Sequence, residues 1–185
     1  MTMQAEIAVN LPAGVLEHPY RGDLRKAARL PLVIGLGNLH LSDDGAGIHL
    51  ARALKATLPA SAAVCMDGGL MSPSLFSHVE AATALVLLHC TDMQRIPGYV
   101  NILEGADMDG YLRRPRTRSI QERGLIDLLD LARQRGCLPA RRALVCIQPR
   151  RLEWGEALSL PVFQALPAAA GRVESLLARW RGARN

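Results

Sequence analysis

The amino-acid sequence predicts an α/β domain in which a parallel or mixed sheet carries helices on both faces. Short apolar segments rich in Val, Ile and Leu alternate along the chain with longer segments of helical period, as a parallel sheet with crossover helices requires. The 185 residues are 49% hydrophobic, close to the globular average, and suffice for one domain of ordinary size.

The strands are predicted from short apolar segments. Residues 30–36 read L-P-L-V-I-G-L, a continuous apolar run typical of a buried parallel strand. Residues 98–103 alternate between apolar and polar side chains, which predicts a strand with one wetter face. The remaining short strands are expected at 62–66, 84–89 and 143–147.

Helical periodicity predicts the connecting segments. The helix at 45–58 ends before Pro59, and the helix at 72–80 begins with Ser72 as N-cap and Pro73 in its first position. Two amphipathic segments are expected to form the later helices, at 120–135 and 161–180. Residues 104–117 are polar and are expected to form a loop.

Residues 1–29 lack a clear period and contain several Pro and Gly, so we expect an N-terminal extension before a single domain at 30–185. The longest apolar runs, such as 84–88, are far shorter than the roughly 20 residues of a membrane-spanning helix. No basic segment precedes the first apolar residues, which argues against a secretory signal. The chain is therefore predicted to be a cytoplasmic protein with no membrane partner.

The net charge is +5, from 22 basic and 17 acidic residues, and all the basic residues except Lys26 and Lys55 are Arg, with the densest cluster at residues 113–118. Aromatic residues make up only 4% of the chain, too few to interleave with a basic nucleic-acid surface, so no nucleic-acid partner is expected. The cluster is interpreted as a solvated loop or a docking surface for an acidic protein. No cysteine belongs to a C-x-x-C pair, which favours buried free thiols over a zinc site.

Polar loops follow the first three predicted strands, where ligands bind in open α/β sheets. The first, at 35–47, is not a dinucleotide-binding loop, because position 40 is His and the carboxylates of Asp43 and Asp44 would repel a pyrophosphate. One of these two aspartates is expected to cap the following helix, which leaves the other to face a cleft. Asp67-Gly68-Gly69 and the segment 89–92 end the next two strands.

Seven ordered motifs carry a family resemblance. They are V-I-G-L-G-N at 33–38, S-D-D-G-A-G at 42–47, M-D-G-G at 66–69, P-G-Y-V-N-I-L-E-G at 97–105, E-R-G-L-I-D-L-L at 122–129, C-I-Q-P at 146–149 and L-S-L-P-V at 158–162. Together they cover about residues 30–180, and the chain resembles the maturation endopeptidases of nickel-iron hydrogenases. The resemblance implies a three-layer α/β/α sandwich around a twisted, mostly parallel sheet.

The resemblance also implies a substrate, the precursor of a hydrogenase large subunit, whose C-terminal extension is removed after nickel insertion. The nickel would arrive with the precursor and be held by three side chains of the protease. Asp44 matches the first of these positions. His89 stands where the family has an aspartate, and Gln121 where it has a histidine.

Asp44 and His89 are accordingly the expected nickel ligands, since imidazole also binds nickel, with His40 or a substrate thiolate completing the set. The amide of Gln121 is a poor ligand, and a loss of metal affinity is the other interpretation. The remaining loop residues are expected to contact the precursor, and this group comprises Asn38, Asp43, Asp67, Gly68, Gly69 and Gln121.

The sequence is compatible with two functions. The preserved loops favour an endopeptidase, for which the sequence assigns no nucleophile or base. The substituted ligand positions favour a non-proteolytic assembly factor on the same fold. Trp154 is interpreted either as an aromatic that contacts the substrate or as a residue that caps the core.

Overall fold

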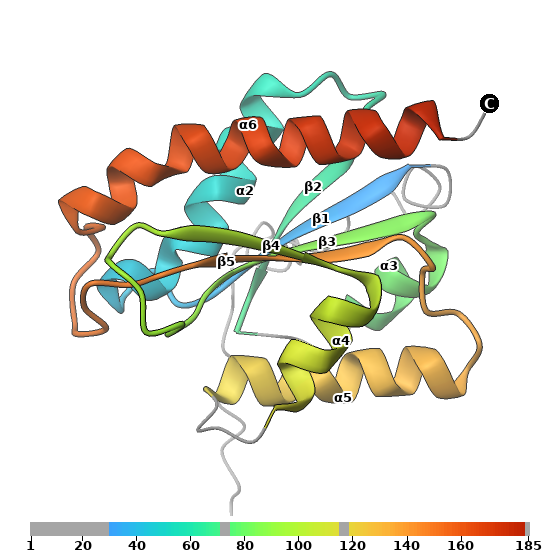
Figure 1. Ribbon diagram of the computed structural model, residues 1–185, viewed down its shortest axis with the longest axis horizontal. Helices are drawn as coiled ribbons and strands as arrows, with labels where there is room; N and C mark the ends of the chain where they lie inside the picture. The colour runs from blue at the N-terminus through green and yellow to red at the C-terminus, as the bar shows by residue number, and fades with distance from the viewer. Residues whose placement is uncertain (1–29, 71–74, 115–118, 184–185) are drawn as a thin grey trace, which may run out of the picture.

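The computed structural model describes residues 30–70, 75–114 and 119–183, so the predicted extension at 1–29 lies outside the described residues. In this part of the chain, five strands form one sheet in the order β2-β1-β3-β5-β4 (Figure 1). All neighbouring strands are parallel except β4, which runs antiparallel to β5. The strands are β1 (Pro31–Leu36), β2 (Val64–Gly69), β3 (Ala84–Cys90), β4 (Val100–Glu104) and β5 (Arg142–Ile147).

Helices cover both faces of the sheet and complete three layers (Figure 1). Helices α2 (Ala46–Thr57) and α6 (Leu160–Gly182) pack on one face, with Val33 and Val86 in the core between the layers. The other face is covered by α3 (Leu75–Ala81), α4 (Gly105–Arg113) and α5 (Ile120–Gln134). Because both faces are buried, successive side chains of β1 and β3 are all apolar up to the last residues of each strand, which explains their continuous apolar sequences. The predicted α/β/α sandwich is confirmed.

Helix α4 corrects the prediction that residues 104–117 form a loop. Residues 105–113 are helical, and residues 115–118 lie outside the described part of the chain. Met108 and Leu112 are one turn apart and fully or almost fully buried against the core of that face. The prediction was wrong because Gly105, Gly110 and the acidic residues give this segment a weak local helix propensity and interrupt its apolar period. The helix forms because tertiary packing outweighs that weak propensity.

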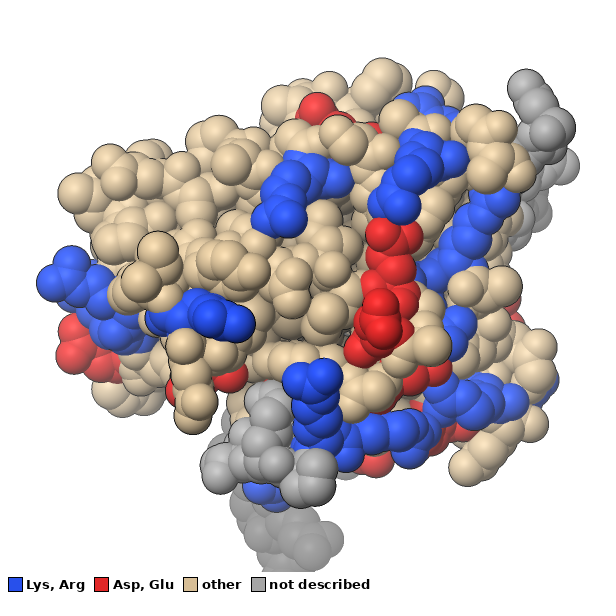
Figure 2. Space-filling model, viewed as in Figure 1, with Lys and Arg blue, Asp and Glu red and all other residues tan. Residues whose placement is uncertain are grey.

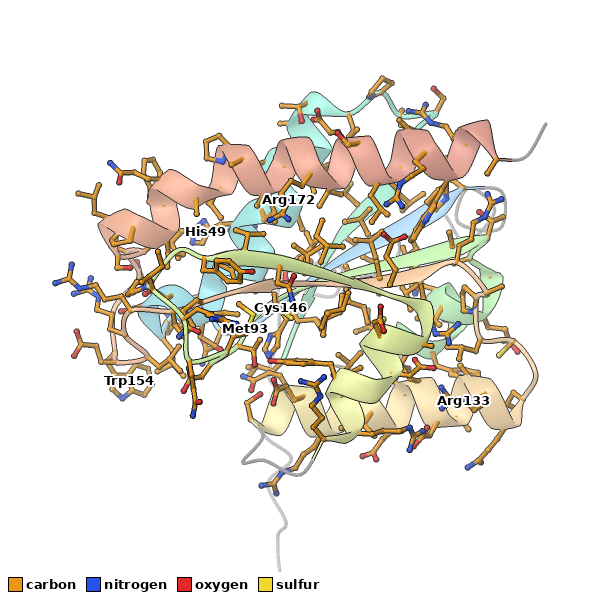
Figure 3. All side chains as sticks on the ribbon, in the orientation of Figure 1. His49, Met93, Arg133, Cys146, Trp154 and Arg172 are labelled. Atoms are coloured by element: carbon orange, nitrogen blue, oxygen red, sulfur yellow. The ribbon has the colours of Figure 1, made fainter. Side chains whose placement is uncertain are left out.

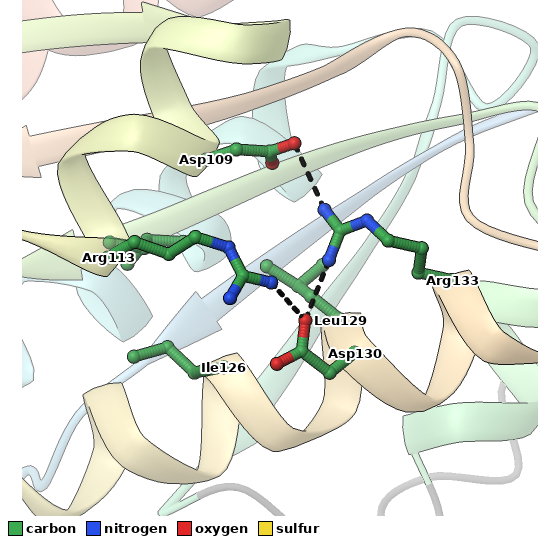
Figure 4. Close-up of a pocket in the computed structure, with 7 residues that line it drawn as sticks. Asp109, Arg113, Ile126, Leu129, Asp130 and Arg133 are labelled. Atoms are coloured by element: carbon green, nitrogen blue, oxygen red, sulfur yellow. Dashed lines mark hydrogen bonds and ion pairs between the residues drawn. The ribbon is translucent and has the colours of Figure 1, made fainter.

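Ion pairs anchor α4 to α5 and β5 (Figure 4). Asp109 binds Arg142 at 2.6 Å and Arg133 at 3.0 Å, and the hydrogen bonds from Arg142 hold the pKa of Asp109 below its usual value. Asp130 pairs with Arg133 at 2.6 Å and also with Arg113. Exposed pairs each contribute little to stability, but this connected set fixes how α4 lies on its neighbours.

Of the arginine cluster at 113–118, only Arg113 and Arg114 lie within the described residues, and both have partners. Arg113 is engaged by Asp130, and the guanidinium of Arg114 lies 5.9 Å from the ring centroid of Tyr111. Over α4 and α5, Lys and Arg side chains lie next to Asp and Glu side chains (Figure 2). None of the described helices combines the length and apolar character that a bilayer crossing requires.

Two glycines let α2 approach the sheet closely. A Cβ atom on Gly47 would lie 2.2 Å from the carbonyl oxygen of Leu88 and 2.5 Å from that of Leu36. A Cβ atom on Gly35 would lie 2.3 Å from the carbonyl oxygen of Gly47. The first turn of α2 thus sits directly on the ends of β1 and β3, and it carries the preceding 3-10 turn η1 (Ser42–Gly45) to the same place.

Gly47→Ala is expected to destabilise the fold by about 1–3 kcal/mol, because the new methyl group would overlap backbone atoms that cannot move independently. Gly171→Ala in α6 is the matched control, since nothing lies within 4 Å of its Cβ position. The control should stabilise the protein by about 0.5–1 kcal/mol through helix propensity. Urea unfolding followed by circular dichroism measures both, and equal effects of the two variants would contradict the close-packing argument.

Candidate active site

A cleft of about 890 Å³ opens beside the carboxyl ends of the central strands. Its walls come from η1, the end of β3 and the following loop, β4, the end of α4 and the start of α5. The carboxylates of Asp44 and Glu122 both line it, together with Thr91, Arg95 and Tyr99. The cleft thus lies at the edge of the sheet where the sequence places a ligand site.

Asp44 lies in the wall with 7% of its surface exposed. The backbone N–H of Asn38 donates a hydrogen bond to its Oδ2 at 2.7 Å, and the Nε2 of Gln121 donates to the same oxygen at 3.3 Å. Burial raises the pKa of Asp44 above its ordinary value, and the hydrogen bond from Asn38 opposes this shift only in part. Asp44 is therefore a more basic carboxylate than an exposed aspartate.

Glu122 is a second buried carboxylate of the site that the sequence analysis missed. Its Oε1 accepts a hydrogen bond from the Oγ1 of Thr91 at 2.5 Å and lies 3.9 Å from the Nε2 of His89. The available signal was S-x-x-E at 119–122, a helix N-terminal motif in which the Oγ of Ser119 accepts from the N–H of Glu122 at 3.1 Å. That motif locates Glu122 in the first turn of α5, but the sequence does not place this turn at the end of β3.

His89 is 1% exposed and is not among the residues that line the cleft. It lies at the end of β3 with its Nε2 3.9 Å from Oε1 of Glu122, and the preceding residue of α5, Gln121, contacts Asp44. Within the described residues, no group of three or more His, Cys, Asp or Glu side chains is arranged to hold a metal ion. The fold therefore brings Asp44, His89 and Gln121 to one place but does not form a three-donor site from them.

Asp43 holds a neighbouring loop instead of capping a helix. Its carboxylate accepts hydrogen bonds from the N–H groups of Arg150 at 2.8 Å and Arg151 at 3.1 Å, and from the N–H of Ser159 at 2.6 Å and its Oγ at 2.8 Å. Burial by itself raises the pKa of Asp43, but these hydrogen bonds together outweigh it and lower the pKa. A fully buried carboxylate thus ties η1 to the segment that leads into α6.

The prediction that Asp43 or Asp44 caps the following helix was wrong. The N-cap of α2 is Gly45, and neither η1 nor α2 has a side-chain hydrogen bond at its N-cap. The extra 3-10 turn rotates both carboxylates away from the start of α2. Asp43 then points to the loop at 150–159, and Asp44 to the cleft.

Ser42 completes this connection in a backbone conformation that is rare for serine, with φ at 46°. Its N–H donates to the carbonyl oxygen of Gly155 at 2.6 Å, and its Oγ to that of Glu153 at 3.0 Å.

His40 is exposed, and its Nδ1 lies 3.4 Å from Glu156. Its side chain is not among those that line the cleft, so the structure does not support its predicted role as an additional ligand.

The segment Asp67-Gly68-Gly69 closes the end of β2 outside the cleft. Asp67 pairs with Arg52 at 2.9 Å and accepts from the N–H of Gly69 at 3.0 Å. Gly68 packs against Ile34, and the carbonyl oxygen of Gly69 accepts from the N–H of Gly37 at 3.0 Å. Contact of this segment with a substrate remains a prediction.

Comparisons with known proteins identify the fold and the family together. A family model described as hydrogenase maturation protease matches residues 48–176. The chain belongs to the hydrogenase maturation protease family. It is 31% identical to the hydrogenase expression/formation protein HoxM of Azotobacter vinelandii, over 80% of this chain and 72% of the relative, and 29% identical to HoxM of Cupriavidus necator, over 82% and 75%.

Solved structures agree with this assignment. The hydrogenase maturating endopeptidase HybD from E. coli superposes with a TM-score of 0.74 at 25% identity, covering 82% of this chain and 93% of that one. The [NiFe] hydrogenase maturation protease HybD from Thermococcus kodakarensis gives 0.69 at 24% identity, over 80% and 99%. The family resemblance inferred from the seven motifs is confirmed, and this member of the family places Asp44 and Glu122 in its cleft.

Asp43→Asn is expected to lower the free energy of unfolding by about 2–3 kcal/mol at neutral pH, because an amide replaces a carboxylate that accepts four hydrogen bonds. Since the pKa of Asp43 is lower in the folded state, its contribution is complete above the ordinary value near 3.8 and is lost as the pH falls through the folded value. Urea unfolding from pH 7 downward should show the difference between wild type and variant shrinking only below about pH 4.

The matched control is Asp127→Asn on the exposed face of α5, which should change stability by less than about 0.5 kcal/mol at every pH. A difference between wild type and Asp43→Asn that stays constant down to acid pH would contradict the assignment of the effect to this carboxylate.

Proposed function

We propose that this chain is a maturation endopeptidase that removes the C-terminal extension of a nickel-loaded [NiFe] hydrogenase large-subunit precursor in the cytoplasm. In this proposal residues 30–185 form the protease domain and residues 1–29 an extension to it. The observation that carries the proposal is the pair of buried carboxylates, Asp44 and Glu122, that line one cleft in a member of this protease family.

The two carboxylates suit peptide hydrolysis, which needs a group that takes a proton from the attacking water. Both hydrogen bonds to Asp44 fall on Oδ2, and Oδ1 accepts none from the described residues. Its raised pKa makes Asp44 a stronger base than an exposed aspartate, so we assign it to accept the proton. Glu122 is oriented by the hydrogen bond from Thr91. Asp44 and Glu122 together form the polar surface of the cleft on which a scissile peptide would lie.

The nickel of the precursor is the part of the family resemblance that these side chains do not fit. Gln121 donates its amide hydrogen to Asp44, so its nitrogen is not a ligand, and His89 is buried beside Glu122. Of the two predicted ligands, only Asp44 faces the cleft. We therefore propose that Asp44 alone contacts the metal region of the precursor and that nickel contributes less to recognition than three charged or imidazole ligands would provide.

A second candidate function is a non-proteolytic assembly factor that binds the same precursor. The observation that favours it is the replacement of two nickel-ligand positions by His89 and Gln121, since a factor that only binds the precursor does not need the complete ligand set that the family resemblance implies. The two candidates differ in the fate of the extension, which stays attached in the second.

Purified protein mixed with nickel-loaded precursor should shorten the precursor by its extension, as followed by intact mass. Asp44→Asn keeps the shape of the side chain but removes the base, and should slow cleavage by about 100-fold or more. For the wild type, the rate should fall as the pH drops through the raised pKa of Asp44.

Asp127→Asn serves as the control and should cleave like the wild type. A stable complex in which the wild-type protein leaves the extension intact would overturn the endopeptidase and leave the assembly factor.

Gln121→His is expected to increase the affinity for Ni²⁺, because it replaces a hydrogen-bond donor to Asp44 by an imidazole ligand at the same place. A gain of at least about 10-fold, the scale on which changes around a metal site act, should be seen by isothermal titration calorimetry. Adding Asp44→Asn to Gln121→His should remove the gain. Wild-type protein that binds Ni²⁺ as tightly as Gln121→His would show that the native side chains already suffice.

A further inference from the structure

Exposed apolar side chains gather at one end of the molecule, beside the cleft. Among the described residues, all large apolar side chains that are exposed come from three segments at this end, apart from Leu70 and Leu131. We name five of them the apolar rim, namely Ile96 at 77% exposure, Leu152 at 54%, Trp154 at 83%, Leu160 at 64% and Phe163 at 62%. Single exposed apolar residues are ordinary on a protein surface, but such a concentration marks an interaction surface.

The three segments are in contact with one another. They are the β3–β4 loop, the β5–α6 loop and the first turn of α6, which lie at the same end of the sheet (Figure 1). The first and third touch at Gly98, where a Cβ atom would lie 2.5 Å from the carbonyl oxygen of Pro161. The second runs directly into the third along the chain. The rim is therefore a local feature of the fold and not a set of scattered residues.

The side chain of Trp154 is 83% exposed, which excludes the interpretation that it caps the core. Hydrogen bonds on both sides of Trp154 fix the backbone from which it projects. On one side of it, the carbonyl oxygen of Glu153 accepts from the Oγ of Ser42. On the other side, the N–H of Gly155 donates to the carbonyl oxygen of His40 at 3.0 Å. Figure 3 shows the indole pointing away from the body of the molecule. An aromatic side chain on a pre-ordered backbone loses little entropy on binding, which makes it a strong anchor for a partner.

The rim is continuous with the cleft. Leu152 belongs to both, and Tyr99 and Arg95 of the adjoining loop line the cleft as well. The guanidinium of Arg95 lies 5.9 Å from the ring centroid of Tyr99, and Arg151 pairs with Glu153 at 3.4 Å. The same segments also expose the carboxylates of Glu153 and Glu156, so the surface is mixed in charge and suits a partner through its apolar side chains, on a body that lies next to whatever enters the cleft.

We propose that the apolar rim docks the folded body of the precursor whose C-terminal segment enters the cleft, an inference that rests on the proposed function. Leu152 lines the cleft together with Asp44 and also belongs to the rim, so a tail bound in the cleft places its folded body beside Trp154 and the first turn of α6. The cleft acts on the tail, and the rim supplies most of the affinity for the folded substrate.

The test measures binding, so that it does not depend on cleavage. Full-length protein is titrated against immobilised precursor by biolayer interferometry, and against a synthetic peptide of the precursor's C-terminal segment. The double variant Trp154→Ala/Phe163→Ala should weaken binding of the precursor by about 30-fold or more, the scale of a lost interface anchor. It should bind the peptide as the wild type does. Leu131→Ala, an exposed leucine on α5, is the matched control and should change neither affinity.

Three results would overturn the inference. The first is an affinity of the double variant for the precursor within about 3-fold of the wild type. The second is an equal loss of peptide binding, which would show that the substitutions disturb the cleft. The third is a wild-type dimer that the double variant converts to monomer in sedimentation velocity with precursor binding unchanged, which would assign the rim to a second copy. Failure of the wild type to cleave would overturn the proposed function alone, because the binding measurement still decides the rim.

Discussion

The buried carboxylate of Asp43 is the interaction on which the functional end of this protein depends. It lies in a 3-10 turn between β1 and α2 and accepts four hydrogen bonds from residues more than a hundred positions later. These bonds fix the β5–α6 loop, the start of α6 and η1 relative to one another. The cost of burying a charge is offset because Oδ2 of the carboxylate accepts three hydrogen bonds and Oδ1 accepts one. The next residue, Asp44, is thereby directed into the cleft.

The polar groups of the site stabilise one another without the donor set that the family resemblance implies. Gln121 and the backbone of Asn38 satisfy Asp44, while Thr91 satisfies Glu122 next to His89. Both carboxylates are therefore held in place before any substrate arrives. Such preorganisation suits a site that acts on a peptide bond, since the groups need not reorder during the reaction. His89, although at the expected strand end, is buried beside Glu122.

The arrangement separates two tasks at the same sheet edge. Deep in the cleft, charged and polar side chains lie where parallel strands end and α5 begins. Around its mouth, apolar side chains project from the β3–β4 loop, the first turn of α6 and the β5–α6 loop, the last of which is hydrogen-bonded to Ser42 and Asp43. A folded substrate with a flexible tail matches both parts, because its body covers the rim and its tail fills the cleft. The close contact of Gly47 with the ends of β1 and β3 fixes the position of α2, and with it of Asp43 and Asp44, relative to the sheet.

The sequence by itself determined the fold class, the strands, most helices, the family and the placement of Asp44. Buried parallel strands and amphipathic helices have local periodic patterns, and the ordered loop motifs are specific enough to name a family. Helix α4 was not predictable, since its stability comes from the burial of Met108 and Leu112 and from ion pairs to distant residues. Only the tertiary structure showed that Asp43 anchors a loop, that Glu122 faces the cleft and that Trp154 points outward. Each of these depends on a contact between segments far apart in the chain, and no local pattern encodes the direction of a single side chain.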